Sequence, residues 1–179
     1  VEEGARTGLA SVVTGILFAV PVAASIANPP TTETAKANLA KAGPIENFDM
    51  FQLADGIDDG ALNSEAITAA YLERIAAVDD SGPMLNAVIA TFPDALDQAR
   101  AMDAELKAGK YRGPMHGIPV LVKDNIEVAG PIATTAGSLA LAANVTGRDA
   151  PLVARLKAAG AIVVAKTNLS EWANFRSTK

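Results

Sequence analysis

The pattern of apolar and polar positions predicts a regular series of helices and strands from residue 63 onward. The series begins with apolar residues at helical spacing, at Ile67, Tyr71, Ile75 and Val78. Asn63 or Ser64 is suited to cap this helix, because a side-chain oxygen there can accept a backbone N–H bond, and Glu65 favours the first turn. We therefore expect a helix through Ala77 that ends before Ser81-Gly82-Pro83.

A strand, a second helix and another strand are predicted next. Residues 85–91 (LNAVIAT) have β-type composition, and residues 118–122 form a second apolar run. Between them, Pro93 opens a helix that Gly109 ends. The inward positions expected for this helix are Ala95, Leu96, Ala99, Met102, Ala104 and Leu106.

The last part of the pattern completes an α/β alternation. Asp149 is expected to cap a helix that Gly160 ends, with Leu152, Val153, Leu156 and Ala159 on one face. Residues 161–165 form an almost fully apolar strand, and a final helix is expected near Ser170. Continuous apolar strands between helices are typical of a sheet covered on both faces, so the predicted fold class is α/β.

The amino-terminal region has a different pattern. No charged residue occurs from Thr7 to Thr32, and residues 9–27 are predominantly apolar and end in small residues. We expect residues 1–27 to be a signal-peptide-like helix with a cut after Ala27, although the start carries Glu2 and Glu3 against a single Arg6. An uncleaved membrane anchor and a buried helix are the alternatives. A cleaved signal peptide and an uncleaved anchor both predict a secreted or periplasmic protein. The expected linker covers residues 28–49, and the expected folded domain covers residues 50–179.

Composition narrows the possible functions. The chain has 179 residues, of which 50% are hydrophobic and 20% charged, so neither disorder nor a fibrous repeat fits. Cysteine is absent and His116 is the single histidine, which excludes thiolate catalysis, disulfides and a His-rich metal cluster. A net charge of −5 argues against a nucleic-acid partner, because phosphate binding needs concentrated Lys and Arg.

Lys123 is the candidate catalytic residue. It follows the apolar run Gly117 to Val122, at the carboxyl end of a predicted strand, where open α/β sheets present their chemistry. Burial there would disfavour the ammonium form, so Lys123 could act as a general base. The alternative is an ordinary strand-end lysine paired with Asp124. The segment 129–138, rich in Gly and Thr, could bring backbone amides to a ligand or be a loop with a helix cap.

Three segments resemble the amidase signature family of hydrolases. They read HGIPVLVKDN over 116–125, ATTAGSLAL over 133–141 and GAIVVAKTNLSEWANFRS over 160–177. The similarity covers about residues 50–176, the amino-terminal third of a family member, so the implied fold is the first part of a mixed β-sheet covered by helices. The KTNLSEWANFR portion is particularly similar to the bacterial peptide amidase branch, which removes the carboxamide from peptide C termini.

This resemblance implies a Ser-cisSer-Lys mechanism in which Lys123 matches the family lysine. The neutral lysine accepts a proton from a bridging serine, which deprotonates the nucleophilic serine as it attacks the amide carbonyl. Ammonia leaves, water hydrolyses the acyl-enzyme, and backbone N–H groups stabilise each oxyanion. The implied substrate is a small amide or peptide amide, and no metal or organic cofactor is implied.

Both serines of the family follow the KTN segment, so the resemblance implies an amino-terminal fragment that is inactive alone. Ser138 and Ser170 are expected to be helix caps and Ser177 to lie in the tail, while His116 is expected to be a structural residue before the strand. Two alternatives remain open. One is a non-catalytic, membrane-anchored or interaction remnant, and the other is an α/β ligand-binding domain that uses Lys123 for an anion.

Overall fold

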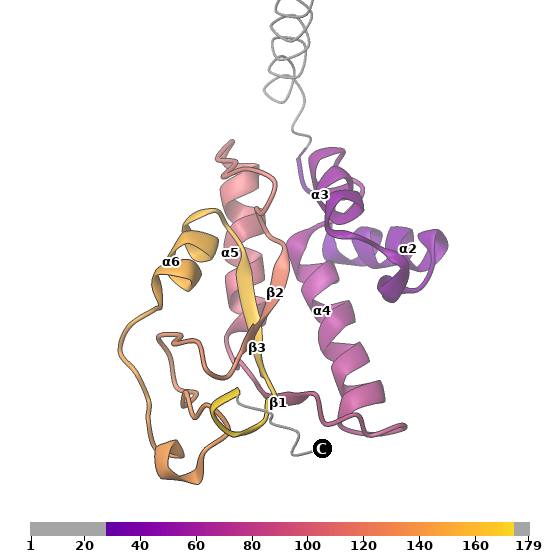
Figure 1. Ribbon diagram of the computed structural model, residues 1–179. Coiled ribbons are helices and arrows are strands. Elements are labelled where there is room, and N and C mark those ends of the chain that lie inside the picture. Colours follow the sequence, from indigo (N-terminus) through magenta and orange to yellow (C-terminus); the bar gives the residue numbers. More distant parts are fainter. Residues whose placement is uncertain (1–27, 174–179) are drawn as a thin grey trace, which may run out of the picture.

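The structure is a computed structural model that describes residues 28–173, a small sheet with helices around it (Figure 1). Five α-helices and three strands are present in this range. The helices are α2 (Thr32–Ala42), α3 (Met50–Asp58), α4 (Ser64–Arg74), α5 (Ala95–Lys107) and α6 (Pro151–Ala158). The strands are β1 (Val88–Thr91), β2 (Pro119–Lys123) and β3 (Ile162–Thr167). Short helical segments are η1 (Ile45–Asn47), η2 (Ile75–Asp79), η3 (Leu139–Leu141) and η4 (Glu171–Ala173).

The sheet has the order β1-β3-β2, with β3 parallel to β2 and antiparallel to β1. Every residue from Ile162 to Lys166 is buried, which explains the continuous apolar run of this central strand. Residues of β1 alternate between half-buried and exposed positions, and the end of β2 alternates between exposed and buried ones. The predicted α/β class with a mixed sheet and surrounding helices is confirmed.

Two apolar clusters form the core. The first lies around the sheet and joins it to α5 and α6, through residues that include Phe92, Ala99, Val122, Val153 and Val163. The second joins the amino-terminal helices to α4, α5 and the residue before β2, through residues that include Leu39, Leu53, Ile57, Ile67, Leu106 and Ile118. The strand β2 therefore lies between the two clusters, which fixes the position of its carboxyl end.

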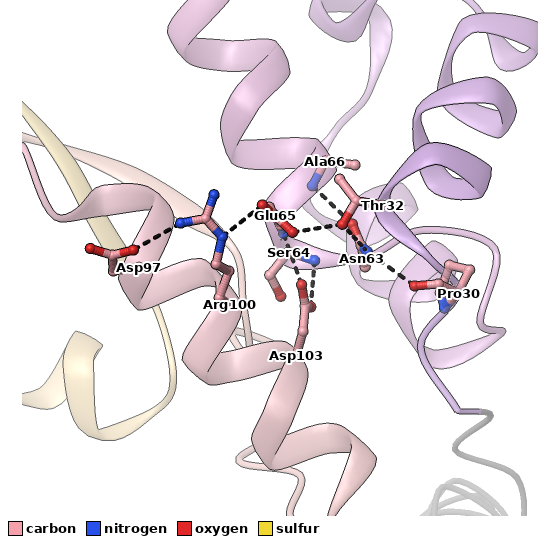
Figure 2. A network of polar contacts seen from close by, with 9 residues as sticks. All are labelled: Pro30, Thr32, Asn63, Ser64, Glu65, Ala66, Asp97, Arg100 and Asp103. Atoms are coloured by element: carbon pink, nitrogen blue, oxygen red, sulfur yellow. Dashed lines mark hydrogen bonds and ion pairs between the residues drawn. The ribbon is translucent and has the colours of Figure 1, made fainter.

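A polar network holds the start of α4 (Figure 2). The Asn63 side chain accepts a hydrogen bond from the backbone N–H of Ala66 at 2.8 Å, which confirms the predicted cap. Asp103, on α5, accepts hydrogen bonds from the backbone N–H groups of Ser64 at 2.7 Å and Glu65 at 3.0 Å. Side chains therefore satisfy three of the N–H groups that a helix leaves unpaired at its first turn, and two of these bonds come from another helix.

The segment 28–49 differs from the predicted linker, because it contains α2 and η1. Thr31 caps α2 by accepting a hydrogen bond from the backbone N–H of Thr34. Leu39 and Ile45 are buried in the second cluster, and the Asn38 amide donates to the carbonyl of Ala61 at 2.8 Å. These contacts join the segment to residues far along the chain, so the expected boundary at residue 50 is not a break in the structure.

Several local predictions were wrong in detail. Asp149 does not cap α6, whose N-cap is Ala150, and instead accepts hydrogen bonds from the backbone of Ala129 and from Lys157. Ala104 and Leu152 are exposed, although the pattern placed both on inward faces. The strand predicted from residue 85 begins at Val88.

The signal-peptide-like segment over residues 1–27 lies outside the described residues, and its role stays a prediction. Among residues 28–173, no helix is both long and apolar enough to cross a membrane.

Candidate active site

Lys123 is the last residue of β2 and is paired in register with Thr167, the last residue of β3. Because β2 and β3 are parallel, their carboxyl ends lie at the same edge of the sheet, which is where α/β sheets bind their ligands. Lys123 is exposed in the structure. The expected buried setting for this lysine is therefore not provided by residues 28–173.

A tight turn follows Lys123. The backbone N–H of Ile126 donates to the carbonyl of Lys123 at 3.0 Å, and the N–H of Asp124 donates to the carbonyl of Thr167 at 3.0 Å. The Asp124 side chain is buried and turns into the protein. The backbone position of Lys123 is thus held both by its own turn and by the end of β3.

Asp124 brings the Gly- and Thr-rich loop to this edge. One carboxylate oxygen of Asp124 accepts hydrogen bonds from the hydroxyl and the backbone N–H of Thr135, the latter at 3.1 Å. The carbonyl of Asp124 also accepts from the backbone N–H of Ala136 at 3.0 Å. Ala136 has a φ of 50°, a left-handed conformation that is strained for a residue with a side chain and that these contacts hold in place.

The segment after β3 contacts the same loop. The backbone N–H of Trp172 donates to the carbonyl of Ala136 at 2.6 Å, and the hydroxyl of Ser138 donates to Glu171 at 2.8 Å. In Figure 1 the orange loop after β2 and the yellow segment after β3 lie beside each other below the sheet. All three segments that carry the family resemblance therefore meet at the edge that bears Lys123.

Lys166 is a buried cation that the sequence reasoning missed. Its side chain is 0% exposed, and its ammonium nitrogen lies 2.5 Å from the carbonyl of Ile126, 3.1 Å from the hydroxyl of Thr134 and 3.5 Å from a carboxylate oxygen of Asp124. Burial lowers the pKa of Lys166, and the nearby Asp124 carboxylate opposes this shift. A lysine directly after the apolar run 161–165 was the signal that could have revealed it. Asp124 therefore pairs with Lys166, not with Lys123 as the alternative interpretation expected.

The serines and the histidine inside the chain have other positions. Ser138 precedes η3 without capping it through its side chain, and the exposed Ser170 contributes its carbonyl to the backbone N–H of Ala173. Ser177 lies outside the described residues. The buried His116 ring accepts from the backbone N–H of Arg112 and has its other nitrogen 2.9 Å from the carbonyl of Met102, which fits the structural role predicted for it.

No group of three or more His, Cys, Asp or Glu side chains that could hold a metal ion occurs between residues 28 and 173. The polar groups described at the edge of the sheet are the exposed amine of Lys123, the buried pair of Lys166 and Asp124, the hydroxyls of Thr134, Thr135 and Ser138, the carboxylate of Glu171 and backbone amides. This set of groups suits proton transfer and the positioning of a reacting group.

These features define an α/β protein with a lysine at the carboxyl end of a parallel strand pair. Residues 66–179 match the Amidase family, and the chain belongs to that family. The chain resembles the native peptide amidase from Stenotrophomonas maltophilia with 53% identity and a TM-score of 0.71, over 75% of this chain and 27% of that one. The predicted family is confirmed.

Two further relatives are also described as amidases. An amidase family protein from Bacillus anthracis has 34% identity with this chain and a TM-score of 0.71. The match covers 93% of this chain and 31% of the Bacillus anthracis chain. A probable amidase from Arabidopsis thaliana is 47% identical over 118 residues, which are 65% of this chain and 22% of that protein. The chain therefore spans less than a third of the length of each of these relatives.

Proposed function

We propose that this chain supplies the catalytic lysine, Lys123, of an amide hydrolase of the Ser-cisSer-Lys type. The observation that carries the proposal is the meeting of the three resemblance segments at the carboxyl ends of β2 and β3, beside Lys123. Family membership and the identity with a peptide amidase support it.

In the proposed reaction Lys123 acts as the base of a proton relay. Its neutral amine takes the proton of a bridging serine, and that serine takes the proton of the nucleophilic serine as the new C–O bond forms to the amide carbon. The relay returns a proton to the leaving nitrogen as the C–N bond breaks, so ammonia departs and an ester remains on the enzyme. Water then attacks the ester by the same relay and releases the acid.

The proposal assigns both serines to the part of the enzyme that follows residues 165–175 in the family. Ser138 and Ser170 have the backbone and side-chain contacts described above, and neither is proposed as the nucleophile. The exposure of Lys123 agrees with this assignment, because a base that works in a dry site needs further protein to exclude water from it. The 179-residue chain alone is therefore expected to be inactive.

The proposed substrate class is a small amide or the terminal carboxamide of a peptide. The identity with peptide amidases, one of which is known in complex with the competitive inhibitor chymostatin, supports a peptide-like substrate. We also propose a secreted or periplasmic location, which rests on the apolar segment over residues 9–27.

A graft tests the proposal. The part of this chain that matches the Stenotrophomonas maltophilia peptide amidase replaces the corresponding segment of that enzyme. Ammonia release by the hybrid enzyme is then measured with a C-terminally amidated peptide. We expect turnover by the graft and background rates for the 179-residue chain. A folded graft without turnover would contradict the proposal and favour an anion-binding or interaction role for Lys123. Robust turnover by the chain alone would contradict the assignment of the serines.

A further inference from the structure

The buried cation Lys166 has no part in the relay described above. Transfer of an ammonium group into the protein interior is costly unless oxygen atoms replace its water. Lys166 meets this need with the carbonyl of Ile126, the hydroxyl of Thr134 and the carboxylate of Asp124. A well-packed apolar residue in this strand would remove the need for such compensation. The arrangement therefore calls for an explanation beyond packing.

The partners of Lys166 lie on the two segments that surround Lys123. Ile126 and Asp124 belong to the turn in which the carbonyl of Lys123 accepts the N–H of Ile126. Thr134 belongs to the loop that Asp124 holds through Thr135. One ammonium group thus ties β3 to the turn after β2 and to the loop 134–138.

We propose that Lys166 and Asp124 form a positioning pair that holds the turn bearing Lys123 and the loop 134–138 in the geometry needed for amide hydrolysis. This inference rests on the proposed function of Lys123. Lys166 itself is a positioning residue, because its ammonium group is enclosed by protein oxygens and is 0% exposed to a substrate.

The activity test uses the grafted peptide amidase. Lys166→Met, which keeps an unbranched side chain, shorter by one heavy atom, and removes its charge, is expected to lower kcat by about 10- to 100-fold, since a misplacement of about 1 Å can cost about 100-fold. KM is expected to change less than about twofold, because the substrate-binding walls are untouched. Thr134→Val removes one oxygen partner and is expected to change kcat in the same direction by a smaller factor.

A purely structural role gives a different result. If Lys166 only stabilises the fold, Lys166→Met lowers Tm. At temperatures well below Tm, the kcat per folded molecule then equals that of the unmodified graft. The matched control is Lys157→Met, which breaks the ion pair between α6 and Asp149 at 2.8 Å and is expected to leave kcat unchanged. Unchanged kcat in both Lys166→Met and Thr134→Val would overturn the inference.

Two further measurements separate the possible failures. If Lys123→Met keeps the activity of the graft, the proposed function fails and the inference falls with it. If Lys123→Met is inactive and the Lys166 and Thr134 variants are fully active, the inference alone fails. In the 179-residue chain, Lys166→Met is expected to accelerate hydrogen exchange at the amides of Asp124 and Ala136 by about 10-fold or more, and unchanged exchange there would also contradict the positioning role.

Discussion

Gly117 lies directly against the side chain of Ser64, the first residue of α4. A β-carbon at Gly117 would lie 1.8 Å from the hydroxyl oxygen and 2.8 Å from the β-carbon of Ser64, which is fully buried. Gly117 also has a φ of +75° and donates its N–H to the carbonyl of Gly160 at 2.8 Å. This close approach sets the start of β2, and with it the position of Lys123, against α4.

Gly117→Ala is therefore expected to destabilise the chain strongly. Overpacking costs about 1–3 kcal/mol in addition to the cost of about 1–2 kcal/mol for the left-handed backbone. Gly109→Ala is a matched control, because Gly109 has a φ of +76° and no atom within 4 Å of the place that a β-carbon would take. Urea unfolding followed by circular dichroism measures both variants, and equal losses of unfolding free energy would contradict the packing argument.

Asp103→Ala is expected to weaken the start of α4. The carboxylate of Asp103 accepts two backbone N–H groups, and leaving them without an acceptor costs about 1–3 kcal/mol each when they are buried. The control is Asp97→Ala on the same helix, which removes an exposed pair with Arg100 worth about 0–1 kcal/mol. Unfolding free energies measured at neutral pH should separate the two variants clearly, and a loss for Asp103→Ala no larger than that for Asp97→Ala would be inconsistent with the network in Figure 2.

Glu105 is expected to contribute to the acid sensitivity of the fold. Hydrogen bonds from Arg112, at 2.6 Å, and from Lys110, at 2.8 Å, lower the pKa of Glu105 to about 2. Since this value lies below that of the unfolded chain, about 4.3, the stabilisation is complete above about pH 4.5 and is lost as the pH falls toward about 2. Glu105→Gln should therefore flatten the fall in unfolding free energy between these pH values. An unchanged slope in Glu105→Gln would refute the assignment.

The two lysines at the edge of the sheet should differ in chemical reactivity. Lys123 is exposed and Lys166 is fully buried, so an amine-reactive reagent should modify Lys123 in the native 179-residue chain about as fast as the exposed Lys41. Lys166 should react only after unfolding. Peptide mapping by mass spectrometry reads all three sites in one sample. Rapid modification of Lys166 in the folded chain would argue against its enclosure by Asp124, Ile126 and Thr134.

Much of the fold could be predicted because its signals are local. The helical spacing of apolar residues after Asn63 predicts the buried face of α4, and the apolar run of β3 predicts a buried strand. Each prediction uses only residues within the segment itself. The helix α2 was missed because its few apolar residues are buried by contacts with distant parts of the chain, and the bond from Asn38 to Ala61 is likewise long-range. Asp149 was assigned to the wrong role because one of its partners, the backbone N–H of Ala129, comes from a distant loop, and the other, Lys157, lies in the last turn of α6.

The candidate site could be predicted in part for the same reason. The strand-end position of Lys123 follows from the apolar run before it, and the structure places it there. The pairing of Lys166 with Asp124, which lie far apart in the sequence, depends on the register of β2 with β3, and no local pattern contains that information. The exposure of Lys123 likewise depends on which segments cover the edge of the sheet.

Replacement of Lys123 by Met in the grafted peptide amidase tests the central claim most directly. The account predicts a loss of kcat of at least about 100-fold, as expected for the removal of a general base, with a folded protein by circular dichroism. Lys107→Met, at an exposed lysine at the end of α5, serves as the control and should keep the activity of the graft. Turnover by the Lys123→Met graft at the rate of the unmodified graft would contradict the assignment of Lys123 as the catalytic base.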